Sequence, residues 1–188
     1  MEAAASANPR SGNPAQFLTF LIAGEEYGID ILNVQEIKGW GPITRIPNTE
    51  DYVLGVINLR GTVVPVVDMR KRFGMNGADF GPTTVVIVVK LSQHGVDRRV
   101  GLVVDAVSEV YQFADDAIQP TPDLVSGTRA DFVTGLATVD KKMVILLTVD
   151  KLVSFDTAGA VAAAAADATL QRAPDARREP VERVPVPA

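Results

Sequence analysis

The sequence predicts an all-β protein made of two small, related barrels, and three observations support this prediction. Short runs rich in β-branched residues alternate with glycine, proline, asparagine and aspartate, which is typical of strands and tight turns. A spacing pattern in the first half of the chain recurs in the second half. Each half offers about five strands and only single-turn helices, and closing such a sheet into a barrel removes its exposed edges.

Residues 55–74 contain the clearest local pattern and predict a strand, a hairpin, a second strand and a helical turn. Two apolar runs, residues 55–59 and 63–67, flank a short polar corner. Arg60 and Gly61 lie at this corner, where glycine accepts the positive φ that a tight hairpin needs. The hairpin therefore holds an arginine at its tip.

Three further residues define the end of this segment. Pro65 cannot donate a hydrogen bond to a neighbouring strand, which predicts an edge or bulge position. Asp68 is expected to cap a short basic helix, and Gly74 is expected to end it.

Other segments extend the β pattern over both halves. Residues 31–37 continue an apolar run, and the choice between a strand and a helical turn stays open over so few residues. Asp150 is expected to cap a short helix at residues 151–155. The remaining predicted strands are residues 16–23, 27–30, 83–91, 99–104, 107–113, 132–139 and 143–149.

Two spaced patterns occur twice in the same order, which indicates an internal duplication. The first pattern is Gly28, Val34, Glu36 and Ile37, repeated as Gly101, Val107, Glu109 and Val110. The second runs from Gly55-Val56 through a hairpin to Val67-Asp68, repeated from Gly135-Leu136 to Val149-Asp150. Two related barrels packed together would leave a groove between them, where a partner can lie.

The duplication sets the expected domain organisation. Residues 16–155 form the folded part, with subdomains at roughly 16–82 and 83–155; exchange of strands between them stays open. Residues 1–15 are expected to be a disordered tail. Residues 156–188 are expected to hold an alanine-rich helix followed by a disordered, proline-containing tail.

Composition excludes several classes of protein. The chain has 188 residues and no cysteine, which rules out a disulfide framework, a thiolate metal site and a cysteine nucleophile. The single histidine, His94, cannot build a histidine metal cluster. A net charge of −5 argues against binding nucleic acid through counterion release. No apolar run approaches the roughly 20 residues of a membrane helix, so we expect a cytoplasmic protein.

Motifs of catalysis are also absent. The sequence has no Gly-x-Ser-x-Gly elbow, no phosphate-binding loop ending in Gly-Lys-Ser/Thr, no dinucleotide fingerprint and no His-Glu-x-x-His. Carboxylates such as Asp30 and Asp68 fall singly at the ends of predicted elements, where helix capping explains them. We therefore expect no enzyme, no metal and no cofactor.

A longer ordered set of motifs resembles one known family. In order, the set comprises Glu26-Tyr27-Gly28-Ile29-Asp30-Ile31, Val34-Gln35-Glu36-Ile37, Thr44-Arg45-Ile46-Pro47, Gly55-Val56-Ile57-Asn58-Leu59-Arg60-Gly61, Val64-Pro65-Val66-Val67-Asp68, Thr84-Val85-Val86-Ile87-Val88, Gly101-Leu102-Val103-Val104-Asp105 and Phe132-Val133-Thr134-Gly135. Residues 16–155 thereby resemble the CheW family of bacterial chemotaxis coupling proteins. The resemblance implies two tandem five-stranded SH3-like β-barrels. It also implies a non-catalytic adaptor that joins the cytoplasmic tips of chemoreceptors to the regulatory domain of the histidine kinase CheA.

The resemblance further implies two sets of site residues. Val34, Glu36, Arg60, Val85, Val107 and Val110 match positions that serve receptor binding in the family. Among them, Glu36 and Arg60 match a charged pair, in which Glu36 could orient the arginine. Ile43, Thr44, Arg45, Ile46 and Pro47 are the candidate kinase-binding edge, because Pro47 limits that strand and would leave backbone groups free. The alternatives for these residues are plain core packing of the valines, a solvated Glu36, and local capping of carbonyls by Arg60.

Other proteins with this fold leave two alternatives open. The kinase regulatory domain and the front half of CheV share the fold, but no kinase core or receiver domain accompanies it here, which favours a stand-alone adaptor. An adaptor of the same fold in another receptor–kinase pathway, for motility or development, cannot be separated by sequence. A small β-barrel enzyme or nucleic-acid binder is a third class, disfavoured by the acidic charge and the missing motifs.

Overall fold

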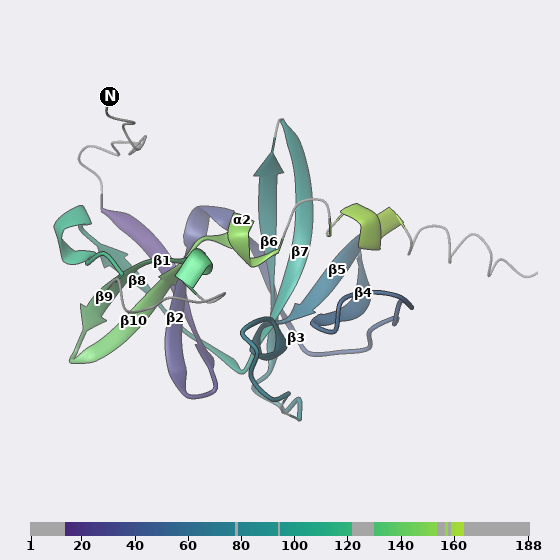
Figure 1. The fold of residues 1–188 in the computed structure, drawn as a ribbon, viewed down its shortest axis with the longest axis horizontal. Coiled ribbons are helices and arrows are strands. Elements are labelled where there is room, and N and C mark those ends of the chain that lie inside the picture. Colours follow the sequence, from purple (N-terminus) through teal and green to yellow (C-terminus); the bar gives the residue numbers. More distant parts are fainter. Residues whose placement is uncertain are drawn as a thin grey trace, which may run out of the picture.

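In the part of the chain that the structure describes, ten strands form two five-stranded sheets that lie side by side along the long axis of the molecule (Figure 1). The structure is a computed structural model and describes residues 14–77, 79–93, 95–121, 130–153, 157 and 159–163. Residues 1–13, His94 and residues 164–188 lie outside the described part, and with them most of both predicted tails. The predicted all-β fold with two five-stranded units is confirmed.

Each sheet has its own strand order. Sheet A runs β8-β1-β2-β10-β9, with β1 (Ala15–Ile22), β2 (Glu25–Asp30), β8 (Ala106–Phe113), β9 (Val133–Val139) and β10 (Lys142–Leu147). Sheet B runs β3-β6-β7-β5-β4, with β3 (Val34–Gly39), β4 (Val53–Leu59), β5 (Thr62–Asp68), β6 (Val85–Gln93) and β7 (Val96–Val104). The short helices are α1 (Met69–Arg72), α2 (Val149–Leu152), η1 (Ile31–Asn33), η2 (Asp115–Ala117) and η3 (Ala130–Phe132).

Each sheet combines strands from both halves of the chain. β1 and β2 join β8, β9 and β10, while β6 and β7 join β3, β4 and β5. The exchanged strands meet in parallel pairs, where Gly28 lies opposite Leu146 and Gly101 lies opposite Val66. These pairs are equivalent in the repeat, so the two exchanges are reciprocal. A boundary between residues 82 and 83 separates the two repeats but not the two sheets.

The sheets differ from the closed barrels expected from the sequence. In the strand orders, β3 and β4 are the edges of sheet B, and β8 and β9 are the edges of sheet A. No continuous ladder joins these edges within the described residues. Instead, one isolated bridge touches an edge strand in each sheet, Thr44 with Val56 of β4 and Gln119 with Leu136 of β9. The loop after β3 therefore contacts β4, and the loop after β8 contacts β9. Each contact is a single bridge and not a full ladder of hydrogen bonds.

Glycine at the start of β4 permits this crossing. Gly55 has φ +142°, and a Cβ atom there would lie 2.2 Å from the Thr44 carbonyl oxygen. Its repeat equivalent Gly135 faces the matching loop, where a Cβ atom would lie 2.9 Å from the Gln119 carbonyl oxygen. The spacing of these two glycines in the sequence therefore reflects a close backbone approach that recurs in both sheets.

The residue that caps the short helix after each hairpin was predicted correctly in the first repeat and wrongly in the second. Asp68 accepts hydrogen bonds from the Arg70 and Lys71 amides, as a capping residue should, but α2 has Thr148 at its N-cap. Asp150 is inside α2, so its predicted role as the cap is wrong. Asp68 is equivalent to Thr148 and not to Asp150, so the alignment of the two repeats that the sequence suggested is displaced by two residues at this point. The Asp68 amide donates to the Tyr52 carbonyl just as the Thr148 amide donates to the Phe132 carbonyl.

Pro65 is not at an edge of the sheet. Its strand, β5, lies inside sheet B between β7 and β4, so the edge prediction is wrong. Parallel pairing with β7 covers only Val66, Val67 and Asp68. Pro65 therefore precedes the paired part of the strand on that side, where its missing N–H group leaves no gap in the ladder.

The largest apolar cluster contains side chains from both sheets. Phe20 and Ile29 of sheet A and Ile87 and Leu102 of sheet B are fully buried in it. A smaller cluster that includes Val64, Val66 and Val88 lies on the other face of sheet B, and one that includes Val144 and Leu146 lies on the other face of sheet A. Burial of each such side chain stabilises the fold by about 1.5–3 kcal/mol. The shared cluster thus unites the sheets into one folded unit.

Polar contacts also link the sheets at α1. The guanidinium of Arg70 contacts the carboxylate of Asp105 through two hydrogen bonds of 2.8 and 2.5 Å. Asp105 also accepts from the Ala23 amide in the turn between β1 and β2. Arg72 lies 5.0 Å from the ring centre of Tyr52 and 4.4 Å from that of Phe132. Since these two rings precede β4 and β9 at equivalent positions, Arg72 connects the two repeats.

Replacing Gly55 by alanine tests the close approach. The added Cβ atom would overlap the Thr44 carbonyl, and the positive φ would be strained, so we expect a loss of about 2–4 kcal/mol in the free energy of unfolding. Gly39→Ala is the control, because a Cβ atom there meets nothing within 4 Å. Urea denaturation should show at most about 0.5 kcal/mol for that variant, and equal effects in the two variants would contradict the assignment.

Replacing Asp105 by asparagine tests the link at α1. Burial opposes ionisation of Asp105, but the hydrogen bonds from Arg70 and Ala23 outweigh it and lower the carboxyl pKa. A pKa below the unfolded value of about 3.9 means that the carboxylate stabilises the fold above that pH. The wild type should exceed Asp105→Asn by about 1–2 kcal/mol at pH 7. That difference should shrink as the pH falls below about 4.

Chemical denaturation from pH 7 to pH 3 measures this difference. Asp51→Asn, at an exposed position, provides the control and should show no comparable change with pH. A stability difference that stays constant with pH would contradict the account.

Candidate functional site

An exposed ion pair connects one edge strand of sheet B to the tip of a hairpin. Glu36 lies in β3 and Arg60 at the turn between β4 and β5, with 3.2 Å between the Arg60 Nη2 and Glu36 Oε2 atoms. The side chain of Arg60 is 84% exposed, whereas that of Glu36 is 25% exposed. A pair so accessible to water contributes about 0–1 kcal/mol to stability. Most of the guanidinium surface is therefore available to another molecule.

The hairpin fixes the direction of Arg60. Arg60 and Gly61 both have positive φ, +51° and +86°, as the two-residue turn between paired Leu59 and Thr62 requires. The Gly61 amide donates a 2.8 Å hydrogen bond to the Asn58 side chain, which closes the turn. The predicted tight hairpin is confirmed in this geometry.

The equivalent corner of sheet A has the opposite character. Its hairpin turn is Asp140-Lys141, both with positive φ, whereas the predicted strands 132–139 and 143–149 leave three residues between them. Glu109 and Asp140 occupy the positions of Glu36 and Arg60 in the repeat, and two carboxylates cannot form an ion pair. Partial burial, together with the charges of Glu109, Glu26 and Asp140, raises the pKa of the Tyr111 hydroxyl. The arginine corner is thus particular to sheet B.

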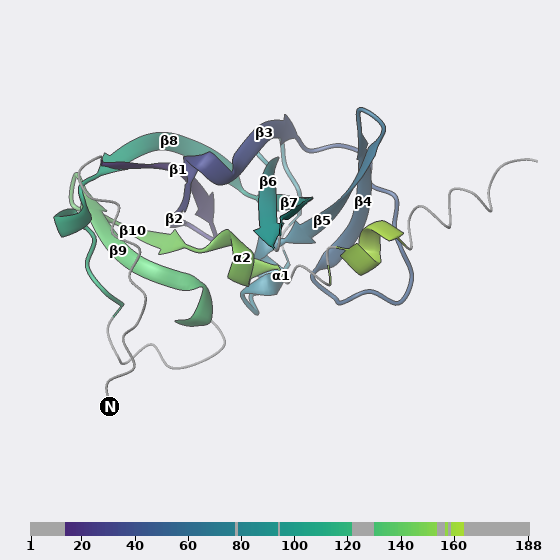
Figure 2. The same cartoon turned by 90° about the horizontal axis from the view of Figure 1, so that it is seen from above.

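The predicted groove valines differ in their exposure. Val34, Val85 and Val107 are partly buried and pack against the cluster shared by both sheets. Val110 of β8 stands out from the surface, with 47% of its area exposed. β3 and β8 lie along one side of the molecule, whereas α1 and α2 lie on the opposite side (Figure 2). The valines therefore combine a packing role with an accessible apolar surface on these edge strands.

Sequence reasoning missed one member of this surface. Ile37 of β3 is 46% exposed and is the repeat equivalent of Val110. The repeat pattern already contained Ile37, and an equivalent pair of exposed aliphatic residues on two edge strands was the available signal.

The candidate kinase-binding segment is less free than expected. The Thr44 amide donates to the Val56 carbonyl (2.9 Å), and the Val56 amide donates to the Thr44 carbonyl (2.8 Å). The argument from free backbone groups therefore fails at Thr44. Thr44, Arg45 and Pro47 are exposed, whereas Ile43 and Ile46 are partly buried against two different clusters. The segment presents side chains rather than an open strand edge.

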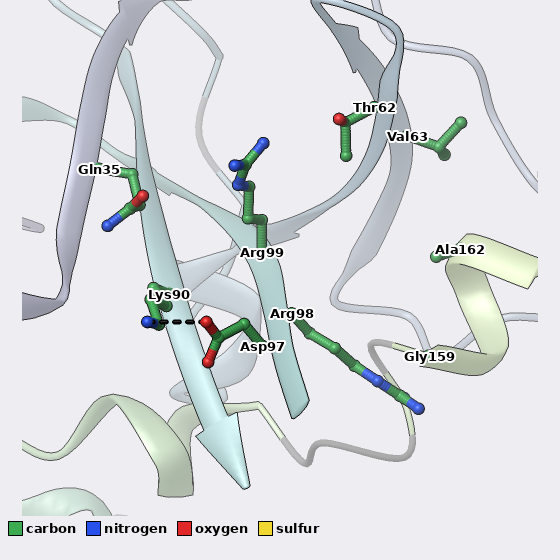
Figure 3. A pocket seen from close by; sticks show the side chains of 9 residues that line it. All are labelled: Gln35, Thr62, Val63, Lys90, Asp97, Arg98, Arg99, Gly159 and Ala162. Atoms are coloured by element: carbon green, nitrogen blue, oxygen red, sulfur yellow. Dashed lines mark ion pairs between the residues drawn. The ribbon is translucent and has the colours of Figure 1, made fainter. Parts of the chain in front are cut away.

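A cavity of about 600 Å³ lies at one end of sheet B. Charged residues of the β6–β7 hairpin line one side of it, and Lys90 pairs with Asp97 at 2.8 Å (Figure 3). The contacts with Lys90 and the Ser92 hydroxyl lower the pKa of the Asp97 carboxyl. By the alternation of side chains along a strand, Lys90 lies on the same face of β6 as the buried Val88, and Arg99 lies on the same face of β7 as the buried Val103. A charged residue that continues the pattern of a buried valine was the signal in the sequence for this site. The full lining is Gln35, Thr62, Val63, Lys90, Asp97, Arg98, Arg99, Gly159 and Ala162.

Among the described residues, none of the helices has the length and apolar character needed to span a membrane. Comparison with known proteins connects the chain to one family. Residues 16–156 match the family model of the CheW-like domain.

Two relatives carry the same name. The chain is 44% identical to the chemotaxis protein CheW of Klebsiella aerogenes over 139 residues, which cover 74% of this chain and 81% of the relative. It is 40% identical to a probable chemotaxis protein CheW of Rhizobium etli over 139 residues, 74% of this chain and 87% of the relative.

A solved structure agrees with the sequence comparisons. The crystal structure of the scaffolding protein TtCheW from Thermoanaerobacter tengcongensis superposes with a TM-score of 0.68 at 36% identity. It covers 77% of this chain and 95% of that one. The chain therefore belongs to the CheW-like family of non-catalytic chemotaxis adaptor proteins.

Proposed function

We propose that this protein couples the cytoplasmic tips of chemoreceptors to the regulatory domain of the histidine kinase CheA. The observation that carries the proposal is the Glu36–Arg60 pair, which is exposed, adds little to stability and has no equivalent in the related corner of sheet A. Family membership supports an adaptor role in chemotaxis. The protein would act in the cytoplasm, where it reaches the membrane only through the receptors.

The receptor would contact the side formed by β3 and β8. Val34, Val85 and Val107 would supply its partly buried floor, and Val110 and Ile37 its accessible rims. An apolar surface of this kind suits the apolar face of a helical hairpin. Arg60, held by Glu36, would then present its planar guanidinium to a carboxylate of the receptor.

The kinase would contact a separate surface at residues 43–47. The exposed Thr44, Arg45 and Pro47 side chains would make the contact, and the bridge between Thr44 and Val56 would hold the segment in place. Separate surfaces for the two partners allow both to bind at once, which an adaptor requires.

Co-purification with both partners tests the proposal. A receptor cytoplasmic fragment and the isolated regulatory domain of the kinase should each bind the purified protein, and all three should elute together in size-exclusion chromatography. Failure to bind either partner would refute the coupling role.

Replacing Arg60 by alanine separates binding from folding. Because Arg60 is mostly exposed, the variant should lose at most about 1 kcal/mol of stability, measured by urea denaturation. Receptor-dependent activation of the kinase should nevertheless fall about tenfold, since the guanidinium would be lost from the interface. Asp140→Ala, at the equivalent turn of sheet A, should leave activation unchanged; an unfolded Arg60→Ala protein would show a structural role instead.

Replacing Val110 by aspartate tests the receptor surface. A charge on the accessible rim of an apolar contact should weaken binding of the receptor fragment about tenfold or more, measured by isothermal titration calorimetry. Met143→Asp is the matched control, because Met143 is 58% exposed and lies on β10 rather than on β3 or β8. Equal losses in the two variants would argue against a specific surface.

A further inference from the structure

A buried hydroxyl lies at an irregular point of the β1–β8 ladder in sheet A. Leu18 pairs with Val110 and Phe20 pairs with Val107, so one residue of β1 faces two residues of β8 between these pairs. This two-against-one arrangement is a β-bulge, at which the ladder is interrupted and the bulged strand bends. Thr19 is the single residue on β1, and it is fully buried. The bulge therefore sets the direction in which β8 continues to Val110.

The Thr19 hydroxyl contacts the backbone of the bulge. The Glu109 amide donates to this hydroxyl at 3.2 Å, and the Glu109 carbonyl oxygen lies 2.9 Å from it. A carboxyl oxygen of Glu26 in β2, a residue that is only 9% exposed, lies 3.0 Å from the same hydroxyl. With a single proton, the hydroxyl donates to one of these two oxygens at a time. Thr19 thereby ties the bulge of β8 to the buried side of β1 and β2.

The equivalent bulge of sheet B contains no such hydroxyl. Val88 occupies the place of Thr19, because both lie opposite the equivalent glycines of their hairpins. Glu36, the equivalent of Glu109, lies opposite Val88 beside the register shift in β3. Valine has no polar side-chain atom, and the Glu36 side chain is held instead by Arg60. Sheet A has no arginine at its turn, so a buried hydroxyl holds its bulge where a surface ion pair holds the other.

We propose that Thr19 is a positioning residue for the receptor surface on β8. Its hydroxyl fixes the backbone of Glu109 and thereby the place of the next residue, Val110, whose side chain is exposed on the side of the molecule that β8 shares with β3 (Figure 2). Thr19 is buried and would touch no partner, so it acts through β8. The effect on receptor binding rests on the proposed function, whereas the fixing of the β8 backbone does not.

Two variants separate the hydroxyl of Thr19 from its bulk. Thr19→Val nearly keeps the shape of the side chain, removes the hydroxyl and reproduces the residue that sheet B has at this place. Thr19→Ser keeps the hydroxyl and loses the methyl group. A role in hydrogen bonding is thus disturbed by valine, and a role in packing is disturbed by serine.

Thr134→Val is the matched control, because it removes a buried-side hydroxyl from the other edge strand of sheet A. The Thr134 hydroxyl donates to the Leu146 carbonyl at 3.2 Å within the β9–β10 hairpin. Urea denaturation shows whether each variant folds. If the loss of the hydroxyl beside Glu26 prevents folding of Thr19→Val, the double variant with Glu26→Gln takes its place, because it removes the buried carboxyl as well.

Hydrogen exchange followed by NMR tests the fixing of β8. The Glu109 amide should exchange about tenfold or more faster in Thr19→Val than in the wild type, because its hydrogen-bond acceptor is lost. In Thr19→Ser and in Thr134→Val this amide should exchange as in the wild type. Unchanged exchange in Thr19→Val would overturn the contact, and so would an equal increase in the serine variant.

Isothermal titration calorimetry with the receptor fragment tests the positioning. Thr19→Val should bind the fragment about threefold or more weakly than the wild type, whereas Thr19→Ser and Thr134→Val should bind like the wild type. A loss of affinity in the serine variant but not in the valine variant would show a packing role and overturn the proposal.

The two measurements also separate this proposal from the proposed function. Unchanged affinity in Thr19→Val, with a faster Glu109 amide and the expected loss of binding in Val110→Asp, would overturn the positioning alone. Absence of receptor binding in the wild type would refute the proposed function and with it the positioning, while the exchange data would still decide the contact between Thr19 and β8.

Discussion

The apolar cluster between the two sheets is the constraint on which the rest of the structure depends. Side chains from both sheets and both short α-helices meet in it, and the exchanged strands supply members from each repeat. Because β1 and β2 complete a sheet with the second repeat, neither repeat can satisfy its backbone hydrogen bonds alone. Folding of one sheet therefore requires the other half of the chain, and the relative position of the sheets is fixed as a consequence.

This constraint gives the two arginine–carboxylate pairs different roles. Arg70 and Asp105 are mostly buried, with 26% and 30% of their side chains exposed, and they join α1 to the turn between β1 and β2 through Ala23. Glu36 and Arg60 join an edge strand to a hairpin tip, where water weakens their attraction. The Arg70–Asp105 pair holds the two sheets in position. The Glu36–Arg60 pair lies on the surface of a fold whose stability does not depend on it. Such a division suits an adaptor, whose contacts with partners must change without loss of the fold.

The sequence was most informative where local chemistry determines structure. The turn at Arg60 and Gly61 and the cap at Asp68 followed from the conformational demands of those positions, and the repeat revealed the duplicated sheets. Strand exchange could not be predicted, because an exchanged and an unexchanged sheet use the same strands with the same apolar pattern. Pro65 was misplaced for that reason, since its position depends on which strand lies beside β5. The cap of α2 was predicted at the wrong residue because Val149-Asp150 has the same type of sequence as Val67-Asp68 but lies two residues after the equivalent position in the repeat. The pairing of Glu36 with Arg60 followed from the family resemblance and not from the spacing, because the contact depends on the return of the hairpin to an edge strand in three dimensions.

Separate expression of residues 1–82 and 83–188 tests the dependence on strand exchange most directly. Circular dichroism and hydrogen exchange should show each fragment largely unfolded by itself, because each lacks strands of both sheets. Mixing the fragments should restore the protected strands of the intact protein and a cooperative unfolding transition. A fragment that folds cooperatively alone, with protected amides in β4 and β5 or in β9 and β10, would contradict the account.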